Sequence, residues 1–319
     1  MMRTDPVSIH ITDVGPRDGL QNEKQNVPAA AKIALVDALS AAGVREIEVS
    51  SFVSPRWVPQ LADAAEVFAG ITRREGVTYT ALVPNMQGYE AAAAVGVRKI
   101  AVFTAASETF TQRNINATIA ESVARFQPLI ETAHADGVSV RGYVSCAVAC
   151  PYEGPIAPAS VRAVAMQLRD IGVDEIDLGE TLGLAVPRDI EALLERVADV
   201  VLPADLVLHL HDTRGGALAC CARAIDLGVR RFDTSCGGMG GCPYAPGAAG
   251  NLATEDLIYF CDRMGYATGI NLDQVIDAAR HIATAVGRPV SSRVGVAGGC
   301  AAAGEAACAR DSGNESCGS

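Results

Sequence analysis

The chain has 319 residues, of which 49% are hydrophobic and only 5% aromatic, so its core is expected to consist mainly of Ala, Val, Leu and Ile. This length suits either two domains or one large α/β barrel. The formal net charge of -11 argues against a nucleic-acid partner, and no apolar run approaches the roughly 20 residues of a membrane span. Residues 1–7 resemble neither a signal peptide nor a transit segment. We therefore expect a soluble, cytoplasmic protein of bacterial type.

Strand-like and helix-like segments alternate eight times along the chain. Short apolar runs predict the strands 7–14, 44–49, 77–83, 99–103, 138–144, 175–178, 206–210 and 231–234. Helical spacing predicts the helices 27–43, 57–71, 88–95, 119–136, 158–171, 187–200, 216–227, 252–264 and 272–286. Several helices end in a Gly-Val pair, and glycine there suits a left-handed cap before a buried strand.

Eight such units with parallel strands predict a (β/α)8 TIM barrel, an α/β fold. A doubly wound open sheet is the alternative, but it would need fewer units and a phosphate-binding glycine fingerprint after one strand. No internal linker divides the chain. We expect residues 1–290 to form the barrel domain with extra C-terminal helices, and residues 291–319 to form a flexible, disordered tail because they lack sustained periodicity.

The ten cysteines are spread through a large apolar chain and its tail. Secreted disulfide scaffolds are small and dense in cysteine. No CxxC pair is present, which disfavours a structural zinc site. The thiols are therefore expected to be reduced.

The segment 13–21, DVGPRDGLQ, directly follows the first predicted strand. It places Arg17 and Asp18 at the apex of a glycine- and proline-marked turn. An acid beside a base at a strand end can hold a metal and neutralise a developing anion; the alternative is a surface turn with two solvated charges. Glu48 lies in the second strand, where a carboxylate is costly unless it is paired. Arg17 is its candidate partner, and a purely structural ion pair is the alternative.

The seventh strand carries the sharpest signal, Leu208-His209-Leu210-His211-Asp212. The period of two puts both histidines on one face at a strand end, which is a metal-ligand spacing. The alternative is a pair of core histidines satisfied by backbone carbonyls. The other three histidines lack such a context and are expected to be structural or exposed.

A glycine-rich stretch follows the eighth strand, at 237–251. Such a loop can approach a ligand closely or act as a lid, and its Cys242 is a candidate proton donor. Asn251 offers an amide oxygen to a metal. A Rossmann fingerprint fails here because Pro243 stands where the third glycine belongs. A mobile connecting loop without function is the alternative.

Asp18, His209, His211 and Asn251 would together form a site of oxygen and nitrogen ligands. That set favours Mg²⁺ or Mn²⁺, although two histidines would also tolerate zinc.

The chain resembles the 3-hydroxy-3-methylglutaryl-CoA lyase family, within the wider group of metal-dependent TIM-barrel lyases and Claisen-type synthases. The matching blocks are DVGPRDGLQNE at 13–23, IEVSSFVSPRWVPQLAD at 47–63, RNIN at 113–116, RGYVSCAVACPYEG at 141–154, HLHDT at 209–213 and GGCPYAPGAAGNLATEDL at 240–257. The resemblance implies cleavage of 3-hydroxy-3-methylglutaryl-CoA to acetyl-CoA and acetoacetate, in leucine breakdown and ketone-body formation. It also implies an acyl-CoA substrate and a homodimer or larger homo-oligomer.

The resemblance assigns roles residue by residue. It implies that Arg17 stabilises the enolate, that Glu48 supports Arg17, and that Cys242 protonates the acetyl-CoA product. It matches the metal ligands to Asp18, His209, His211 and Asn251. Arg17 and Gln21 are expected to contact the substrate, and His209 or Asp18 is the candidate base.

One departure from the family pattern lies after the sixth strand, where Gly179-Glu180-Thr181 replaces Gly-Asp-Thr. The extra methylene moves a carboxylate, and shifts near ~1 Å can matter to rate. It would either alter the substrate range or be tolerated. The open alternatives are a lyase for a longer 3-hydroxy-3-alkylglutaryl-CoA such as the isohexenyl analogue, a condensing synthase, which Cys242 disfavours, and a non-catalytic barrel, although no metal ligand is lost.

Overall fold

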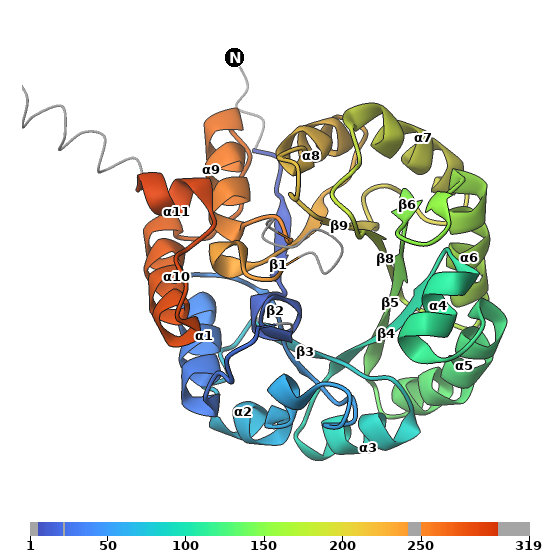
Figure 1. Cartoon of the computed structure of the whole chain (residues 1–319), viewed down its shortest axis with the longest axis horizontal. Helices are drawn as coiled ribbons and strands as arrows, with labels where there is room; N and C mark the ends of the chain where they lie inside the picture. The colour runs from blue at the N-terminus through green and yellow to red at the C-terminus, as the bar shows by residue number, and fades with distance from the viewer. Residues whose placement is uncertain (1–5, 22, 242–249, 299–319) are drawn as a thin grey trace, which may run out of the picture.

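A barrel of eight parallel strands forms the centre of the molecule in this computed structural model, which describes residues 6–21, 23–241 and 250–298 (Figure 1). The barrel closes in the order β1-β10-β9-β8-β5-β4-β3-β2. Its strands are β1 (His10–Asp13), β2 (Glu46–Ser51), β3 (Thr78–Leu82), β4 (Lys99–Ala105), β5 (Ser139–Ser145), β8 (Glu175–Glu180), β9 (Val207–Leu210) and β10 (Arg231–Thr234). Each lies within a few residues of a predicted strand, and the predicted (β/α)8 barrel is confirmed.

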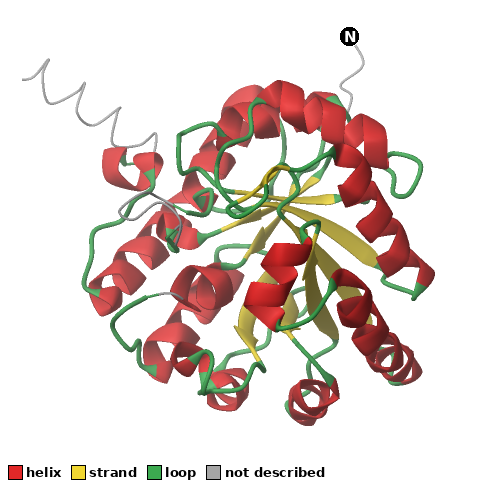
Figure 2. Cartoon of the chain, turned by 45° about the vertical axis from the view of Figure 1, so that its right-hand side comes forward, coloured by secondary structure: helices red, strands yellow, loops and turns green. Residues whose placement is uncertain are grey.

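Helices surround the barrel, as the red helices around the yellow strands in Figure 2 show. They are α1 (Ala29–Ala41), α2 (Ala64–Gly70), α3 (Met86–Ala94), α4 (Glu108–Ile115), α5 (Ile119–Ala135), α6 (Pro158–Asp170), α7 (Pro187–Val197), α8 (Ala217–Asp226), α9 (Thr254–Met264), α10 (Leu272–Val286) and α11 (Arg293–Ala297). The glycines of the Gly-Val pairs, at 43, 96, 137, 172 and 228, have φ between 70° and 102°. These values confirm the left-handed caps that the sequence predicts.

Several short elements were not predicted from the sequence. They are the π-helical turn η1 (Gly15–Gly19), the 3-10 turns η2 (Pro59–Leu61) and η3 (Cys236–Gly238), the helix α4, and the antiparallel pair β6 (Ala149–Cys150) and β7 (Gly154–Pro155). The predicted helix 57–71 is divided into η2 and α2. Gln60 explains the division, because its side-chain amide bonds to the backbone of Val27 at 3.0 Å and Gln25 at 2.8 Å.

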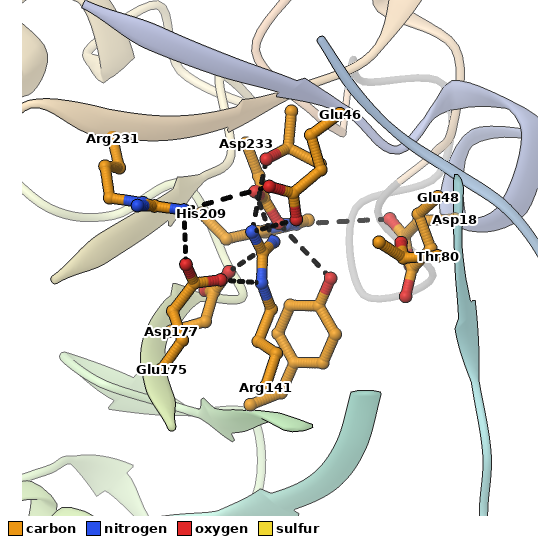
Figure 3. Close-up of polar contacts among 12 residues, drawn as sticks. Asp18, Glu46, Glu48, Thr80, Arg141, Glu175, Asp177, His209, Arg231 and Asp233 are labelled. Atoms are coloured by element: carbon orange, nitrogen blue, oxygen red, sulfur yellow. Dashed lines mark hydrogen bonds and ion pairs between the residues drawn. The ribbon is translucent and has the colours of Figure 1, made fainter. Parts of the chain in front are cut away.

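The two faces of the barrel strands differ in polarity. Apolar strand residues pack with apolar helix residues in one continuous core, which includes Ile47, Val102 and Leu208 from strands and Leu35, Leu129 and Leu193 from helices. The interior instead contains a network of charges at the starts of the strands, formed by Glu46, Lys99, Arg141, Glu175 and Arg231. Figure 3 shows Glu46, Arg141, Glu175 and Arg231 of this network. The opposite, carboxyl ends of the strands carry the loops described below, as expected for this fold.

The described chain continues past the predicted domain boundary at residue 290. The backbone N–H groups of Arg293 and Val294 donate to Asp256 of α9, at 3.2 and 2.7 Å. Ser292 is fully buried and caps α11 by accepting from Gly295 N at 2.7 Å. The first residues of the predicted tail are therefore part of the packed domain, because their backbone groups find partners there. Residues 299–319 lie outside the described residues.

Six described cysteines are buried free thiols, in agreement with the prediction of reduced cysteines: Cys146, Cys150, Cys220, Cys221, Cys236 and Cys261. In the part of the chain that the structure describes, no helix combines the length and hydropathy that crossing a bilayer requires.

Candidate active site

The residues singled out from the sequence meet at the carboxyl ends of β1, β2, β9 and β10. Arg17 and Asp18 lie on η1, which follows β1, and Glu48 lies in β2. His209 is in β9 and His211 directly follows it. Asn251 pairs with His211 through an isolated antiparallel bridge. Residues more than 200 positions apart are thus brought to one edge of the barrel, as the TIM-barrel prediction requires.

The turn η1 is fixed by its backbone. The N–H groups of Arg17, Asp18 and Gly19 all donate to the carbonyl oxygen of Val14, at 3.2, 2.7 and 3.2 Å. A Cβ added at Gly19 would lie 2.6 Å from Ser235 Oγ, so glycine permits close packing on the neighbouring loop. Arg17 is only 6% exposed. The alternative of a solvated surface turn is therefore wrong.

Two carboxylates hold the Arg17 guanidinium. Its Nε lies 2.6 Å from Glu48 Oε2, and its Nη1 lies 2.6 Å from Asp18 Oδ1. The pairing with Glu48 expected from the sequence is thus present. Burial lowers the pKa of Arg17, but Glu48 and Asp18 outweigh it and raise the pKa above its usual value. The guanidinium therefore remains charged and is fixed in orientation beside Asp18.

Three candidate metal ligands converge. One ligand atom each from Asp18, His209 and His211 lies within 4.8 Å of the others. His209 Nε2 is 4.0 Å from Asp18 Oδ2, and the two imidazole centroids are 5.4 Å apart. Asn251 joins them, because its Nδ2 donates to Asp18 Oδ2 at 2.8 Å.

Two buried atoms of this group lack partners among the described residues: His211 Nδ1 and Asn251 Oδ1. Buried polar atoms normally have hydrogen-bond partners, and both of these can donate a lone pair to a cation.

Burial and the charge on His209 lower the pKa of His211 to about 4. Burial opposes ionisation of Asp18, but Arg17 and His209 lower its pKa to about 2. At neutral pH the group thus offers a carboxylate and a neutral imidazole, the protonation states that metal binding requires. The residues present therefore fit a divalent cation.

Asp233 and Arg141, which Figure 3 shows, also belong to the site, as does Tyr143, and the sequence reasoning missed all three. Asp233 Oδ2 lies 3.4 Å from His209 Nδ1, and Arg141 Nη1 donates to Asp233 Oδ1 at 2.9 Å. Tyr143 OH lies 3.3 Å from Asp233 Oδ2, and its ring lies beneath Arg17, 5.7 Å from the guanidinium carbon. The sequence does contain a pattern that could have identified them. In β5, β8 and β10, polar residues alternate with small or apolar ones, which indicates that the polar side chains share the inward face of each strand; they stand at 141 and 143, 175 and 177, and 231 and 233.

Glu180 braces its own loop. Its Oε1 accepts from the N–H groups of Leu182 at 3.4 Å and Leu184 at 3.2 Å, and the residue is 2% exposed. Burial raises its pKa despite these bonds. This bracing explains how a longer carboxylate is accommodated at the end of β8.

Gln21 and Cys242 are the two remaining site residues expected from the sequence. Gln21 follows η1, and its Oε1 is buried without a partner among the described residues. Cys242 lies outside the described residues. The residues flanking its segment meet beside the site, where Gly250 N donates to Gly240 O at 3.3 Å and Asn251 Nδ2 donates to Met239 O at 3.2 Å.

Comparison with known proteins gives consistent matches. The HMGL-like family model matches residues 8–282. A Pseudomonas aeruginosa protein named 3-hydroxy-3-isohexenylglutaryl-CoA/hydroxy-methylglutaryl-CoA lyase is 49% identical over 90% of this chain and 96% of its own length. The crystal structure of a hydroxymethylglutaryl-CoA lyase from Pseudomonas aeruginosa matches with a TM-score of 0.90 at 49% identity, covering 92% of this chain and 97% of that one. A lyase from Acinetobacter baumannii, solved with coenzyme A and 3-methylmalate, matches with a TM-score of 0.87 at 37% identity, covering 91% and 95%.

Proposed function

The chain belongs to the HMGL-like family, and we propose that it is a divalent-metal-dependent lyase that cleaves 3-hydroxy-3-methylglutaryl-CoA to acetyl-CoA and acetoacetate in leucine breakdown. One observation carries the proposal. Asp18, His209 and His211 place ligand atoms within 4.8 Å of one another, directly beside the buried Arg17. A cation site next to a fixed guanidinium suits a reaction in which negative charge develops on a bound thioester.

Asp18, His209, His211 and Asn251 would hold the cation. When bound, it would supply Lewis-acid polarisation of the substrate's hydroxyl and carboxylate oxygens. His209 can take the hydroxyl proton on Nε2 only while that nitrogen does not ligate the cation. Burial lowers the pKa of His209, but Asp233 and Asp18 outweigh that effect and raise it. Asp18, with a pKa near 2, is a weak base.

Loss of the hydroxyl proton allows the hydroxyl-bearing carbon to become the ketone carbon of acetoacetate, as the bond between it and the CH₂ next to the thioester breaks. The bonding electrons pass to the acetyl-CoA fragment as an enolate, whose oxygen would meet Arg17. Glu48 keeps the guanidinium in place through its 2.6 Å contact. Cys242 would then deliver a proton to the enolate carbon, and Gln21 would contact the substrate through its unpartnered Oε1.

A second candidate is the same reaction on a longer acyl chain. The Pseudomonas aeruginosa relative is named for both the isohexenyl and the methyl substrate. Turnover of the two thioesters by this chain, compared as kcat/KM, distinguishes them. We further propose that the cation is Mg²⁺ or Mn²⁺ and that the enzyme is a cytoplasmic homo-oligomer, a homodimer or larger.

The decisive experiment is acetoacetate release from 3-hydroxy-3-methylglutaryl-CoA after chelation, with and without added Mg²⁺. The Cys242→Ala variant is measured beside a control, Cys261→Ala, which replaces a thiol buried in α9. We expect metal-dependent turnover that falls by orders of magnitude in Cys242→Ala only. A folded, metal-loaded protein with no turnover would refute the substrate assignment and favour a different acyl chain or a non-catalytic barrel.

A further inference from the structure

The two ring nitrogens of His209 face different groups. Nε2 points toward Asp18, with its Oδ2 at 4.0 Å, and so toward the candidate metal site. Nδ1 points into the barrel, with Asp233 Oδ2 at 3.4 Å. The ring lies edge-on to Tyr143, with centroids 6.4 Å apart and planes at 86°. These contacts fix which nitrogen faces which side.

Asp233 is itself held firmly. It is 2% exposed, and its Oδ1 accepts from Arg141 Nη1 at 2.9 Å. Arg141 is anchored by further groups from other strands, including Glu46 at 2.8 Å and Thr12 at 3.2 Å. Figure 3 shows Arg141 at the centre of these contacts, with Asp233 and His209 close to it. Because a guanidinium only donates hydrogen bonds, it requires an acceptor oxygen from Asp233.

We propose that Asp233 is a positioning residue that accepts the Nδ1–H of His209 and so fixes the tautomer whose Nε2 lone pair faces the metal site. A carboxylate behind a ligating histidine sets the ring orientation and raises the basicity of the ligand. Neutral imidazole has a proton on one nitrogen only, so a proton fixed on Nδ1 leaves Nε2 free to ligate. This inference rests on the metal site of the proposed function but not on the identity of the substrate.

Asp233→Asn reverses this arrangement without changing the size of the side chain. In this variant Arg141 contacts the amide oxygen, because its N–H groups only donate hydrogen bonds and the amide nitrogen is also a donor. The amide NH₂ then faces His209 Nδ1, which can only accept from it. The imidazole proton therefore moves to Nε2, where it blocks ligation. The metal affinity falls although His209 itself is intact.

Asp177→Asn is the matched control. Asp177 is fully buried, and its Oδ2 lies 3.4 Å from the same Arg141 Nη1. Among the described residues it has no contact with His209. The substitution thus makes the same chemical change in the same network without touching the imidazole.

The experiment is titration of the metal-free full-length protein with Mn²⁺, by calorimetry, for the wild type and both variants. We expect Asp233→Asn to bind Mn²⁺ about 10- to 100-fold more weakly and Asp177→Asn to remain close to the wild type. Equal affinity in the wild type and a folded Asp233→Asn would overturn the role of Asp233 alone. Absence of Mn²⁺ binding by the wild type would overturn the metal site itself, and this inference with it.

A second readout does not depend on metal. Nitrogen NMR of histidine-labelled, metal-free protein, recorded at a pH above the His209 titration and with His209 assigned from a His209→Gln variant, reports which ring nitrogen of the neutral imidazole is protonated. We expect the proton on Nδ1 in the wild type and on Nε2 in Asp233→Asn. A wild-type proton on Nε2 would overturn the inference even if Asp233→Asn failed to fold.

Discussion

Replacing Glu48 with alanine removes one of the two carboxylates that hold Arg17 inside the barrel. The pair is buried, with Glu48 1% exposed and an N–O distance of 2.6 Å. At an effective dielectric constant near 20, that distance corresponds to a Coulomb attraction of about 6 kcal/mol before desolvation is deducted. Breaking a buried pair by removing one partner typically costs about 3–5 kcal/mol. Because Asp18 remains beside the guanidinium, we expect the lower end of that range.

Thermal and urea unfolding measure this cost. A loss of about 3 kcal/mol corresponds to a melting temperature lower by roughly 5–10 °C in a domain of this size. Glu48→Gln keeps an acceptor for Arg17 and should lose less. The control is Glu66→Ala, which changes an exposed glutamate of α2 and should shift stability by at most about 0.5 kcal/mol.

Turnover gives the second part of this prediction. Without Glu48 the guanidinium is free to turn toward Asp18, so we expect kcat to fall by about 10- to 100-fold, less than the loss of a whole oxyanion donor. If Glu48→Ala melts within about 1 °C of the wild type and turns over at the same rate, the pair neither stabilises the fold nor orients Arg17, and the reasoning fails.

Three further predictions concern the metal, pH and the C-terminal segment. Mg²⁺ should raise the melting temperature of the chelated wild type by mass action but not that of His211→Ala; an equal rise in both would exclude His211 as a ligand. Burial raises the pKa of Glu255 from 4.5 to about 8, so the folded state retains a proton that the unfolded state releases. Its stabilising contribution is complete below about pH 4.5 and is lost as the pH rises to about 8. Glu255→Gln should therefore flatten the pH dependence of the urea unfolding free energy across that window, and an unchanged slope would contradict the assignment. Arg293→Ala removes the 2.6 Å pair with Asp212, but its side chain is 64% exposed, so we expect a loss below about 1 kcal/mol; a larger loss by urea unfolding would show that this pair is not a simple surface contact.

Local sequence patterns were sufficient for most of the fold. Apolar periodicity and the Gly-Val caps located the barrel strands and the helices, because both signals act within one turn or one strand. They failed where long-range contacts decide the local structure. Gln60 divides a predicted helix by bonding to residues around position 26, and Asp256 binds residues that lack any periodic pattern of their own.

The candidate site was predicted less completely than the fold. The sequence by itself determined which residues stand at strand ends, and therefore that Asp18, His209, His211 and Asn251 share one edge of the barrel. Only the tertiary structure decided their partners. The period of two indicates that Asp233 points inward, but its meeting with His209 depends on the register between β9 and β10. The contact between Asp18 and Asn251 joins residues 233 positions apart, and it exists only because the barrel closes between β1 and β10.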